Sequence, residues 1–189
     1  MMASTRAAYI DSSGYTDPTT KNSTDLVMWA KFAHAKGWGY VWGTYGDVLD
    51  SDLFEYKKTQ YPDEVGGKAE YIESTWLGGR TADCVGLIKG VLWGWNGDLK
   101  KTYGGATYAS NGVPDIGADS MITKCSDIST DFSSLVPGEA VWMDGHIGVY
   151  IGDGLAIEST PKWDNKVMIT ACNCSKTGYK RRNWTKHGK

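Results

Sequence analysis

The sequence predicts an α+β fold, because helical patterns occupy its first half and strand patterns its second half. Apolar residues recur at helical spacing near 24–36 and again near 84–94. Four strand-like runs follow, near 139–143, 146–151, 155–159 and 166–171. A Gly-rich turn between the second and third runs indicates an antiparallel hairpin. We therefore expect early helices that pack on an antiparallel sheet.

The predicted helix near 24–36 is amphipathic, and we expect its one histidine, His34, to be solvated. A loop-like stretch continues from it to residue 80. The helix near 84–94 is the more informative one, because Asp83, a favoured N-cap residue, stands directly before Cys84. The free backbone N–H groups and the dipole of a first helical turn favour an anion. We therefore expect Cys84 to be a nucleophile whose pKa is lowered, rather than a small buried apolar residue.

A thiol nucleophile needs a base, and the chain contains three histidines. His187 is the third residue from the C-terminus, where fraying is expected, and His34 lies on an ordinary helix. His146 alone has a rigid context, because it begins the strand-like run Gly145-His146-Ile147-Gly148-Val149. We therefore interpret His146 as the general base.

Glu158 is the candidate for orienting the imidazole. Strand-like runs flank Gly152-Asp153-Gly154, which is a hairpin turn signal. With a two-residue loop Glu158 would oppose Val149 and point away from His146. With a three-residue loop, or a bulge at Gly154, it would oppose Gly148 and reach the imidazole diagonally. The alternative is that Glu158 is a solvated strand residue without a catalytic role.

Four blocks of sequence resemble one known family. They are Lys36-Gly-Trp-Gly-Tyr-Val-Trp-Gly43, Asp83-Cys-Val-Gly86, Leu135-Val-Pro-Gly-Glu-Ala-Val-Trp142 and Gly145-His-Ile-Gly-Val-Tyr-Ile-Gly152. In this order they are similar to the NlpC-type bacterial cell-wall cysteine peptidases. The resemblance covers residues 26 to 160 and implies a papain-like fold, in which the nucleophile begins a helix packed on the antiparallel sheet that holds the histidine.

The resemblance also implies an activity and its residues. Members of the family hydrolyse stem peptides of peptidoglycan, typically between D-glutamate and a diamino acid, without a metal or organic cofactor. Cys84 matches the nucleophile and His146 the general base. Asp83 matches the aspartate before the cysteine, and Tyr40 the tyrosine that contacts substrate or helps to stabilise the oxyanion. An aromatic side chain packed on its neighbours is the alternative for Tyr40.

Three departures from the family pattern limit this expectation. Val85 replaces the usual serine, and Glu158 stands where a second histidine is most frequent. Related CHAP hydrolases often have glutamate there, and they include N-acetylmuramoyl-L-alanine amidases as well as endopeptidases. The stretch at about 47–80 is longer than the usual link, so we interpret it as an insertion that forms a cleft wall or a surface loop without consequence. A thiol acyltransferase and a non-catalytic wall-binding module are further alternatives.

Composition bounds the remaining expectations. At 189 residues the chain suits a single domain, 1–189, and we expect a monomer. The family resemblance implies that its partner is bacterial peptidoglycan. A net charge of -2 argues against nucleic-acid binding, and no apolar run approaches the length of a membrane span.

The amino-terminal residues 1–6 lack the apolar stretch of a secretory signal. We therefore expect a cytoplasmic protein that is released or delivered to the wall, such as a phage-type endolysin, or an excised domain of a secreted protein. The spacing of Cys125, Cys172 and Cys174 fits a zinc site poorly, so no metal is expected. Reduced cysteines are favoured, and a bridge from Cys125 to one of the other two stays open.

Overall fold

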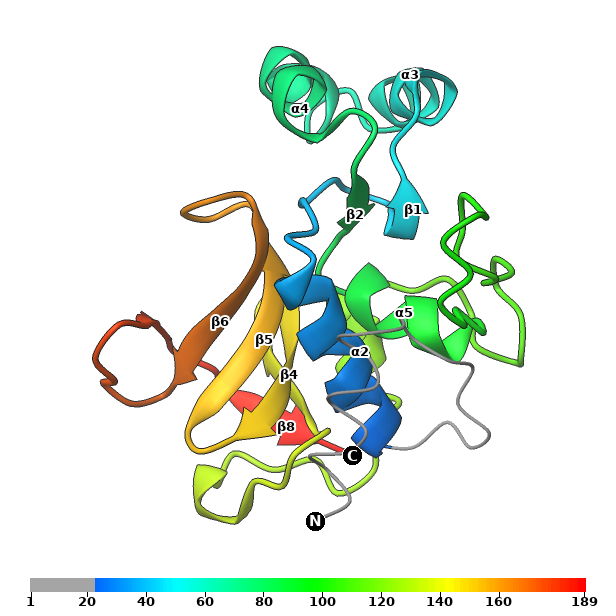
Figure 1. Cartoon of the computed structure of the whole chain (residues 1–189). Helices are drawn as coiled ribbons and strands as arrows, with labels where there is room; N and C mark the ends of the chain where they lie inside the picture. The colour runs from blue at the N-terminus through cyan, green and yellow to red at the C-terminus, as the bar shows by residue number, and fades with distance from the viewer. Residues whose placement is uncertain (1–22) are drawn as a thin grey trace.

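The computed structural model describes residues 23–189, so the amino-terminal stretch 1–6 lies outside it. Within the described residues the fold is mixed α+β, as the sequence predicts. A curled sheet of six strands lies on one side of the molecule, and the helices α2 (Ser23–Ala35) and α5 (Gly86–Leu92) cover one of its faces (Figure 1).

The large sheet has the strand order β7-β6-β5-β4-β3-β8. Its strands are β3 (Ala140–Met143), β4 (His146–Gly152), β5 (Leu155–Thr160), β6 (Lys166–Cys172), β7 (Lys180–Arg182) and β8 (Lys186–Gly188). All neighbours are antiparallel except β6 and β7, which are parallel. The four strands expected from the sequence are therefore present, and the two short strands near the C-terminus were not anticipated.

The two faces of this sheet carry different clusters. Ile147, Val149 and Ile157 belong to the main core, together with Cys84 and with apolar residues of α2 and α5. Val141, Ala156, Cys172 and Trp184 form a second cluster on the opposite face. Alternate residues of β4 and β5 thus point to opposite sides, as the two-residue period of a strand requires.

Helix α5 lies close to the small sheet formed by β1 (Tyr45–Val48) and β2 (Arg80–Ala82). Two glycines of α5 make this approach possible. A Cβ atom on Gly86 would lie 1.9 Å from the Thr44 carbonyl oxygen, and one on Gly90 would lie 2.4 Å from that of Tyr45. Glycine at both positions therefore fixes the distance between the helix that follows Cys84 and strand β1.

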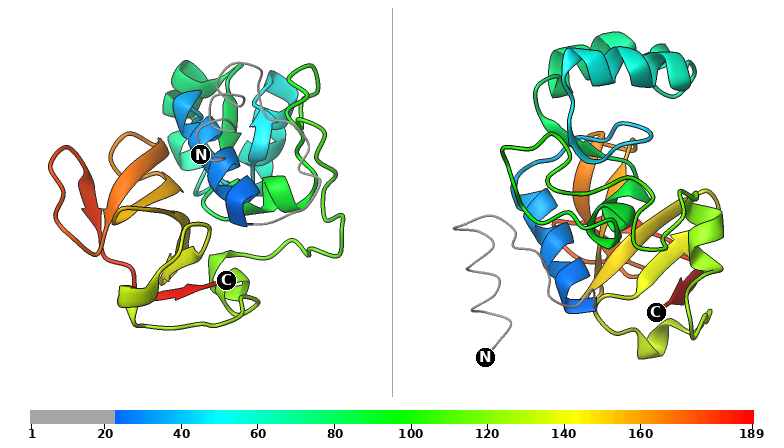
Figure 2. Two further views of the ribbon diagram at one scale, coloured as in Figure 1. Left: turned by 60° about the horizontal axis from the view of Figure 1, so that its bottom comes forward. Right: turned by 90° about the vertical axis from the view of Figure 1, so that its right-hand side faces the viewer.

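The stretch 47–80 is built mainly of two helices, α3 (Ser51–Gln60) and α4 (Ala69–Trp76), with the 3-10 turn η1 (Gly66–Lys68) between them. The Asp50 side chain caps α3 by accepting the Leu53 N–H at 2.9 Å. An apolar cluster of its own holds this unit together: Val41, Leu49, Leu53, Phe54, Val65 and Ile72. The two helices lie side by side at one end of the molecule, away from the large sheet (Figures 1 and 2).

The remaining elements are short. Helix α6 (Ala118–Ile122) and the 3-10 turn η2 (Phe132–Ser134) lie in the long connection between α5 and β3. No helix among residues 23–189 combines the length and apolar character needed to cross a bilayer.

The C-terminal end corrects one expectation. His187 does not fray, because it lies buried in β8 opposite Val141 of β3. Its Nδ1 atom lies 2.5 Å from Glu139 Oε2, and its Nε2 atom lies 2.9 Å from the Asp131 carbonyl oxygen. Both ring nitrogens of this buried side chain therefore have a hydrogen-bond partner. The contact with Glu139 and the strand pairing hold the C-terminus against the sheet.

Candidate active site

The loop before α5 is organised by Asp83. Its Oδ1 atom accepts the Gly86 N–H at 2.5 Å, and its Oδ2 atom accepts the Gly43 N–H at 2.7 Å. The Leu87 N–H donates to the Asp83 carbonyl oxygen at 3.0 Å, which closes a turn around Cys84. The capping role expected of Asp83 is thus present. The helix itself is shorter than expected, since it begins at Gly86, two residues after the thiol, and ends at Leu92.

The environment of Cys84 does not lower the pKa of its thiol in this structure. Burial is the largest influence and the nearby Asp83 carboxylate adds to it, so the pKa rises to about 12. Backbone N–H groups, chiefly that of Ile147, act in the opposite direction but are outweighed. The sequence-based expectation of a lowered pKa is therefore wrong for this state, because it considered the helix start without the packing around it.

His146 and Glu158 are in direct contact. The imidazole Nε2 atom lies 2.7 Å from Glu158 Oε2, and the ring stacks on Trp184 at 5.5 Å between centroids and 9° between planes. No hydrogen bond to the other ring nitrogen, Nδ1, is present among residues 23–189. The carboxylate and the indole together fix the orientation of the imidazole.

A β-bulge makes this contact possible. The loop contains two residues, Asp153 and Gly154, since Gly152 pairs with Leu155. Between Tyr150 and Gly152 the register shifts, so Ile151 is an extra residue and Val149 pairs with Ile157. Continuing that register places Glu158 opposite Gly148, as the pairing with His146 requires. The bulge therefore lies at Ile151, not at Gly154.

Glu158 also has a partner that the sequence did not indicate. Its side chain is fully buried, and it accepts hydrogen bonds from Arg182 Nε at 2.9 Å and from Thr170 Oγ1 at 2.7 Å. Burial acts to raise the pKa of Glu158, but the hydrogen bonds and charges of His146 and Arg182 outweigh it and hold the pKa below its usual value. Glu158 is therefore a buried, ionised carboxylate.

Arg182 lies in Lys180-Arg181-Arg182, a run of three basic residues of the kind that is usually solvated. It is the one buried member of that run. Strand alternation in β7 was the available signal, but β7 has only three residues, so no pattern could be recognised.

The thiol and the imidazole belong to different clusters of the large sheet. Cys84 lies in the main core, whereas the His146 ring stacks on Trp184 of the opposite cluster. The pairing of β4 with β5 ends at Val149 and Ile157. The nucleophile loop lies against the ends of these two strands, since Ser159 Oγ donates to the Ala82 carbonyl oxygen at 2.6 Å and the Ile147 N–H donates to the Cys84 thiol. Cys84 is thus bonded to the residue that follows His146, and no hydrogen bond joins the Cys84 and His146 side chains in the described structure.

Tyr40 is buried near the nucleophile loop. Burial is the main reason that its pKa is raised above its usual value, and the nearby Cys84 and Asp83 add to this effect, so the phenol stays protonated. Its backbone is fixed by Asn165, which donates from Nδ2 to the Tyr40 carbonyl oxygen at 3.0 Å. The structure therefore brings Tyr40, Asp83 and Cys84 together.

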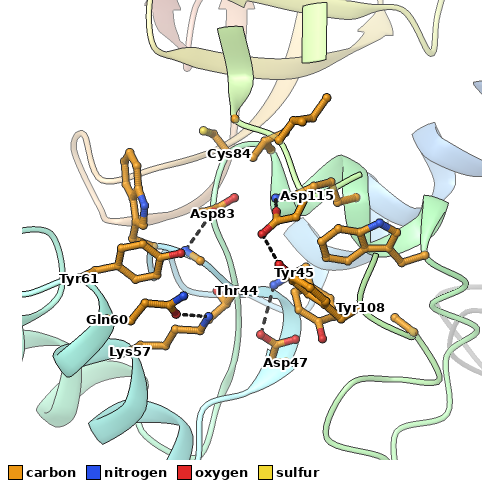
Figure 3. A pocket seen from close by; sticks show the side chains of 18 of the residues that line it. Thr44, Tyr45, Asp47, Lys57, Gln60, Tyr61, Asp83, Cys84, Tyr108 and Asp115 are labelled. Atoms are coloured by element: carbon orange, nitrogen blue, oxygen red, sulfur yellow. Dashed lines mark hydrogen bonds and ion pairs between the residues drawn. The ribbon is translucent and has the colours of Figure 1, made fainter. Parts of the chain in front are cut away.

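A cleft of about 700 Å³ opens beside Cys84 and Asp83. Figure 3 shows Lys57 and Tyr61 on one side of it and Tyr108 and Asp115 on the other. Lys57 lies on α3, so the stretch 47–80 contributes one wall, whereas the loop after α5 contributes the opposite wall. Neither Lys57 nor Asp115 was recognised from the sequence, because no motif marks them.

The four cysteines, all within the described residues, are free thiols. No three His, Cys, Asp or Glu side chains of residues 23–189 are grouped as ligands of a metal ion would be.

Comparison with known proteins gives a limited result. No protein-family model matches the sequence, and no protein with a curated description is similar to it. Among solved structures, the chain is similar to NlpC2 from Trichomonas vaginalis, with a TM-score of 0.44 and 17% identity over 89% of this chain and 49% of that one. NlpC1 from the same organism gives a TM-score of 0.42 and 17% identity over 89% of this chain and 47% of that one. The chain thus spans about half the length of these two structures.

Proposed function

We propose that this chain is a cysteine hydrolase of papain-like fold that cleaves stem peptides of bacterial peptidoglycan. The observation that supports it is the oriented His146–Glu158 pair, together with the adjacent Ile147 N–H that donates to the thiol of Cys84, a residue that lines the cleft. The motif resemblance described above supplies the substrate class. The proposed bond is the one between D-glutamate and the diamino acid.

The chemistry follows from the positions of the three groups. Glu158 holds His146 through Nε2, so Nδ1 is the atom that takes the thiol proton. The resulting thiolate attacks the peptide carbonyl carbon, and a C–S bond forms as the carbonyl oxygen becomes an oxyanion. Backbone N–H groups of the nucleophile loop stabilise this oxyanion. The C–N bond then breaks, the amine leaves with the proton from His146, and water hydrolyses the thioester to regenerate Cys84.

One movement is required before the first step. Because Cys84 and His146 are not hydrogen-bonded in this structure, the thiol must move toward Nδ1 when substrate binds. Catalytic hydrogen bonds are often loose in the absence of substrate and tighten in the complex. Proton transfer to the imidazole also creates an ion pair, which offsets the burial that otherwise keeps the thiol protonated.

The test is digestion of purified peptidoglycan with wild type and with Cys84→Ala, followed by mass analysis of the fragments. We expect new D-glutamate carboxyl and diamino-acid amino termini with wild type only. New termini at the muramoyl–alanine bond would instead identify an N-acetylmuramoyl-L-alanine amidase. Acyl transfer to an added amine would identify an acyltransferase. If both proteins release the same material, or none, the hydrolase proposal is wrong and a wall-binding module becomes the better explanation.

A further inference from the structure

Lys57 is an unusual lysine, because it is almost fully buried and has few partners. It lies on α3 in the wall of the cleft, and 8% of its surface is exposed. Its ammonium group donates one hydrogen bond, to Gln60 Oε1 at 3.1 Å, and lies 5.3 and 5.5 Å from the ring centroids of Tyr56 and Tyr61. An ammonium has three donors, so two are not used within residues 23–189.

The carboxylates near Lys57 are occupied elsewhere. Both oxygens of Asp83 accept backbone N–H groups. Asp115 pairs with Lys89 and accepts from Tyr108 at 2.7 Å. Asp47 is fully buried and bonds to the Tyr45 N–H, and burial raises its pKa to about 8, so this group is largely uncharged at neutral pH. No carboxylate in the described residues forms an ion pair with Lys57.

The position of this ammonium is tied to the nucleophile loop through Gly43. A Cβ atom added to Gly43 would lie 3.1 Å from Lys57 Nζ and 2.5 Å from the Tyr61 ring. The Gly43 N–H in turn donates to Asp83, the residue before Cys84. The absence of a side chain at residue 43 thus lets Lys57 reach into the cleft beside that loop, where Figure 3 shows it facing the cavity.

We propose that Lys57 forms a subsite for a carboxylate of the substrate, next to the reacting carbonyl. A buried ammonium with two unused donors and no ion-pair partner favours an anionic group that can accept hydrogen bonds from it. This inference rests on the proposed function, since it concerns the same cleft. Stem peptides offer two sources of the carboxylate, the glutamate residue and the diamino-acid end. Lys57 thereby makes the 47–80 stretch a determinant of substrate choice.

The experiment uses three synthetic stem peptides. One has every carboxylate free, the second has the glutamate carboxylate as an amide, and the third has the diamino-acid carboxylates as amides. Their affinities are measured by calorimetry on full-length Cys84→Ala, which does not turn them over. We expect one of the amides to bind about tenfold or more weakly than the free peptide, as loss of a charge-assisted hydrogen bond predicts. The amide that binds weakly identifies the source of the carboxylate.

Variants on α3 assign the effect to Lys57. Lys57→Met, in the Cys84→Ala background, is expected to bind the three peptides with equal affinity, and so is Lys57→Gln, which keeps polarity without charge. The matched control is Lys58→Met, because Lys58 lies on the same helix but pairs with Glu55 at the surface. Lys58→Met should still bind the free peptide and the amides with different affinities. Thermal unfolding checks that each variant is folded.

The outcomes separate this inference from the proposed function. Discrimination that persists in both Lys57 variants, equal binding of all three peptides to the Lys57-containing protein, or no binding at all would overturn the subsite. Discrimination that depends on Lys57, in a protein whose wild type hydrolyses nothing, would support the subsite and contradict the hydrolase. Hydrolysis by wild type, without any carboxylate preference in binding, would support the hydrolase and overturn the subsite.

Discussion

Glu158 Oε2 lies 2.7 Å from His146 Nε2, and the same oxygen accepts hydrogen bonds from Arg182. One buried carboxylate therefore contacts two basic side chains, those of His146 and Arg182. It fixes the orientation of the imidazole, and it compensates the charge of a buried guanidinium. A change at Glu158 must consequently affect both activity and stability, and the two effects can be measured separately.

We expect Glu158→Gln to lower the free energy of unfolding by about 3 kcal/mol, because it leaves Arg182 buried without an opposite charge. Activity on peptidoglycan should fall at least about tenfold, since imidazolium is no longer stabilised. Urea unfolding and initial rates give the two numbers. Thr170→Val is the control, since it removes a hydrogen bond to Glu158 but keeps the charge, and should cost about 1 kcal/mol. Full activity in Glu158→Gln would mean that another group orients His146.

Asp47 predicts a pH dependence of stability with a definite sign. The pKa of Asp47 is raised from 3.8 to about 8, mainly by burial, so the folded state holds a proton that the unfolded state releases. The stability of wild type should therefore fall relative to Asp47→Asn as pH rises from about 4 to about 8, by on the order of 1 kcal/mol per pH unit. Urea unfolding of both proteins across this range measures the difference. A constant difference would show that Asp47 is ionised in the folded state.

Cys84 should behave as a protonated thiol in the free protein. Because its pKa is raised to about 12, the rate of its alkylation by iodoacetamide should increase with pH up to about pH 10 without a plateau. Peptide mapping by mass spectrometry distinguishes Cys84 from the other three cysteines. His146→Ala should not change the rate at neutral pH, since no hydrogen bond joins the two side chains in the described structure. A rate that is constant from about pH 5 to 8 would instead indicate a preformed thiolate–imidazolium pair.

The close approach of α5 to β1 predicts that Gly86→Ala is destabilising. The added Cβ would lie 1.9 Å from the Thr44 carbonyl oxygen, so the nucleophile loop or β1 must shift. We expect a loss of about 1–3 kcal/mol, even though alanine favours helix. Gly67→Ala is the matched control, because nothing lies within 4 Å of its added Cβ, and its effect should stay within about 0.5 kcal/mol. Equal stability of the two variants in urea unfolding would contradict the packing described here.

The buried His187–Glu139 pair predicts that His187→Ala costs about 3 kcal/mol, because Glu139 would remain buried without a partner. Hydrogen exchange at residues 186–189 should also become faster, since β8 loses its side-chain anchor. Unfolding in urea and exchange measured by mass spectrometry test these expectations. If exchange in β8 is fast in wild type, the terminal strand is frayed in solution after all.

Much of the site could be predicted because its signals are local. The strands on both sides of Gly152-Asp153-Gly154, and the choice between two faces for Glu158, follow from the two-residue period and from hairpin geometry. The position of the bulge could not be predicted, since nothing in the residue type of Ile151 marks it as the extra one.

Other features depend on contacts between distant residues, which a single sequence does not display. The raised pKa of Cys84 comes first from its burial in the main core and then from the nearby Asp83 carboxylate. The partner of Glu158 is Arg182, in a run of three basic residues that has no periodic pattern. His187 pairs with Glu139, 48 positions earlier, and so overrides the usual fraying of a chain end.

The extra residue at position 151 affects how this chain tolerates changes in its length. Removal of Ile151 would leave Tyr150 paired with Ala156 and Glu158 opposite Gly148, so the hairpin would become regular and His146 would keep its partner. Removal of Val149 would instead move His146 to the helix-covered face of the sheet. Ile151 can thus be removed without changing which residues of β4 and β5 oppose each other, whereas Val149 cannot. Insertions and deletions in related chains should therefore gather at position 151, while the count of residues on either side of it stays constant.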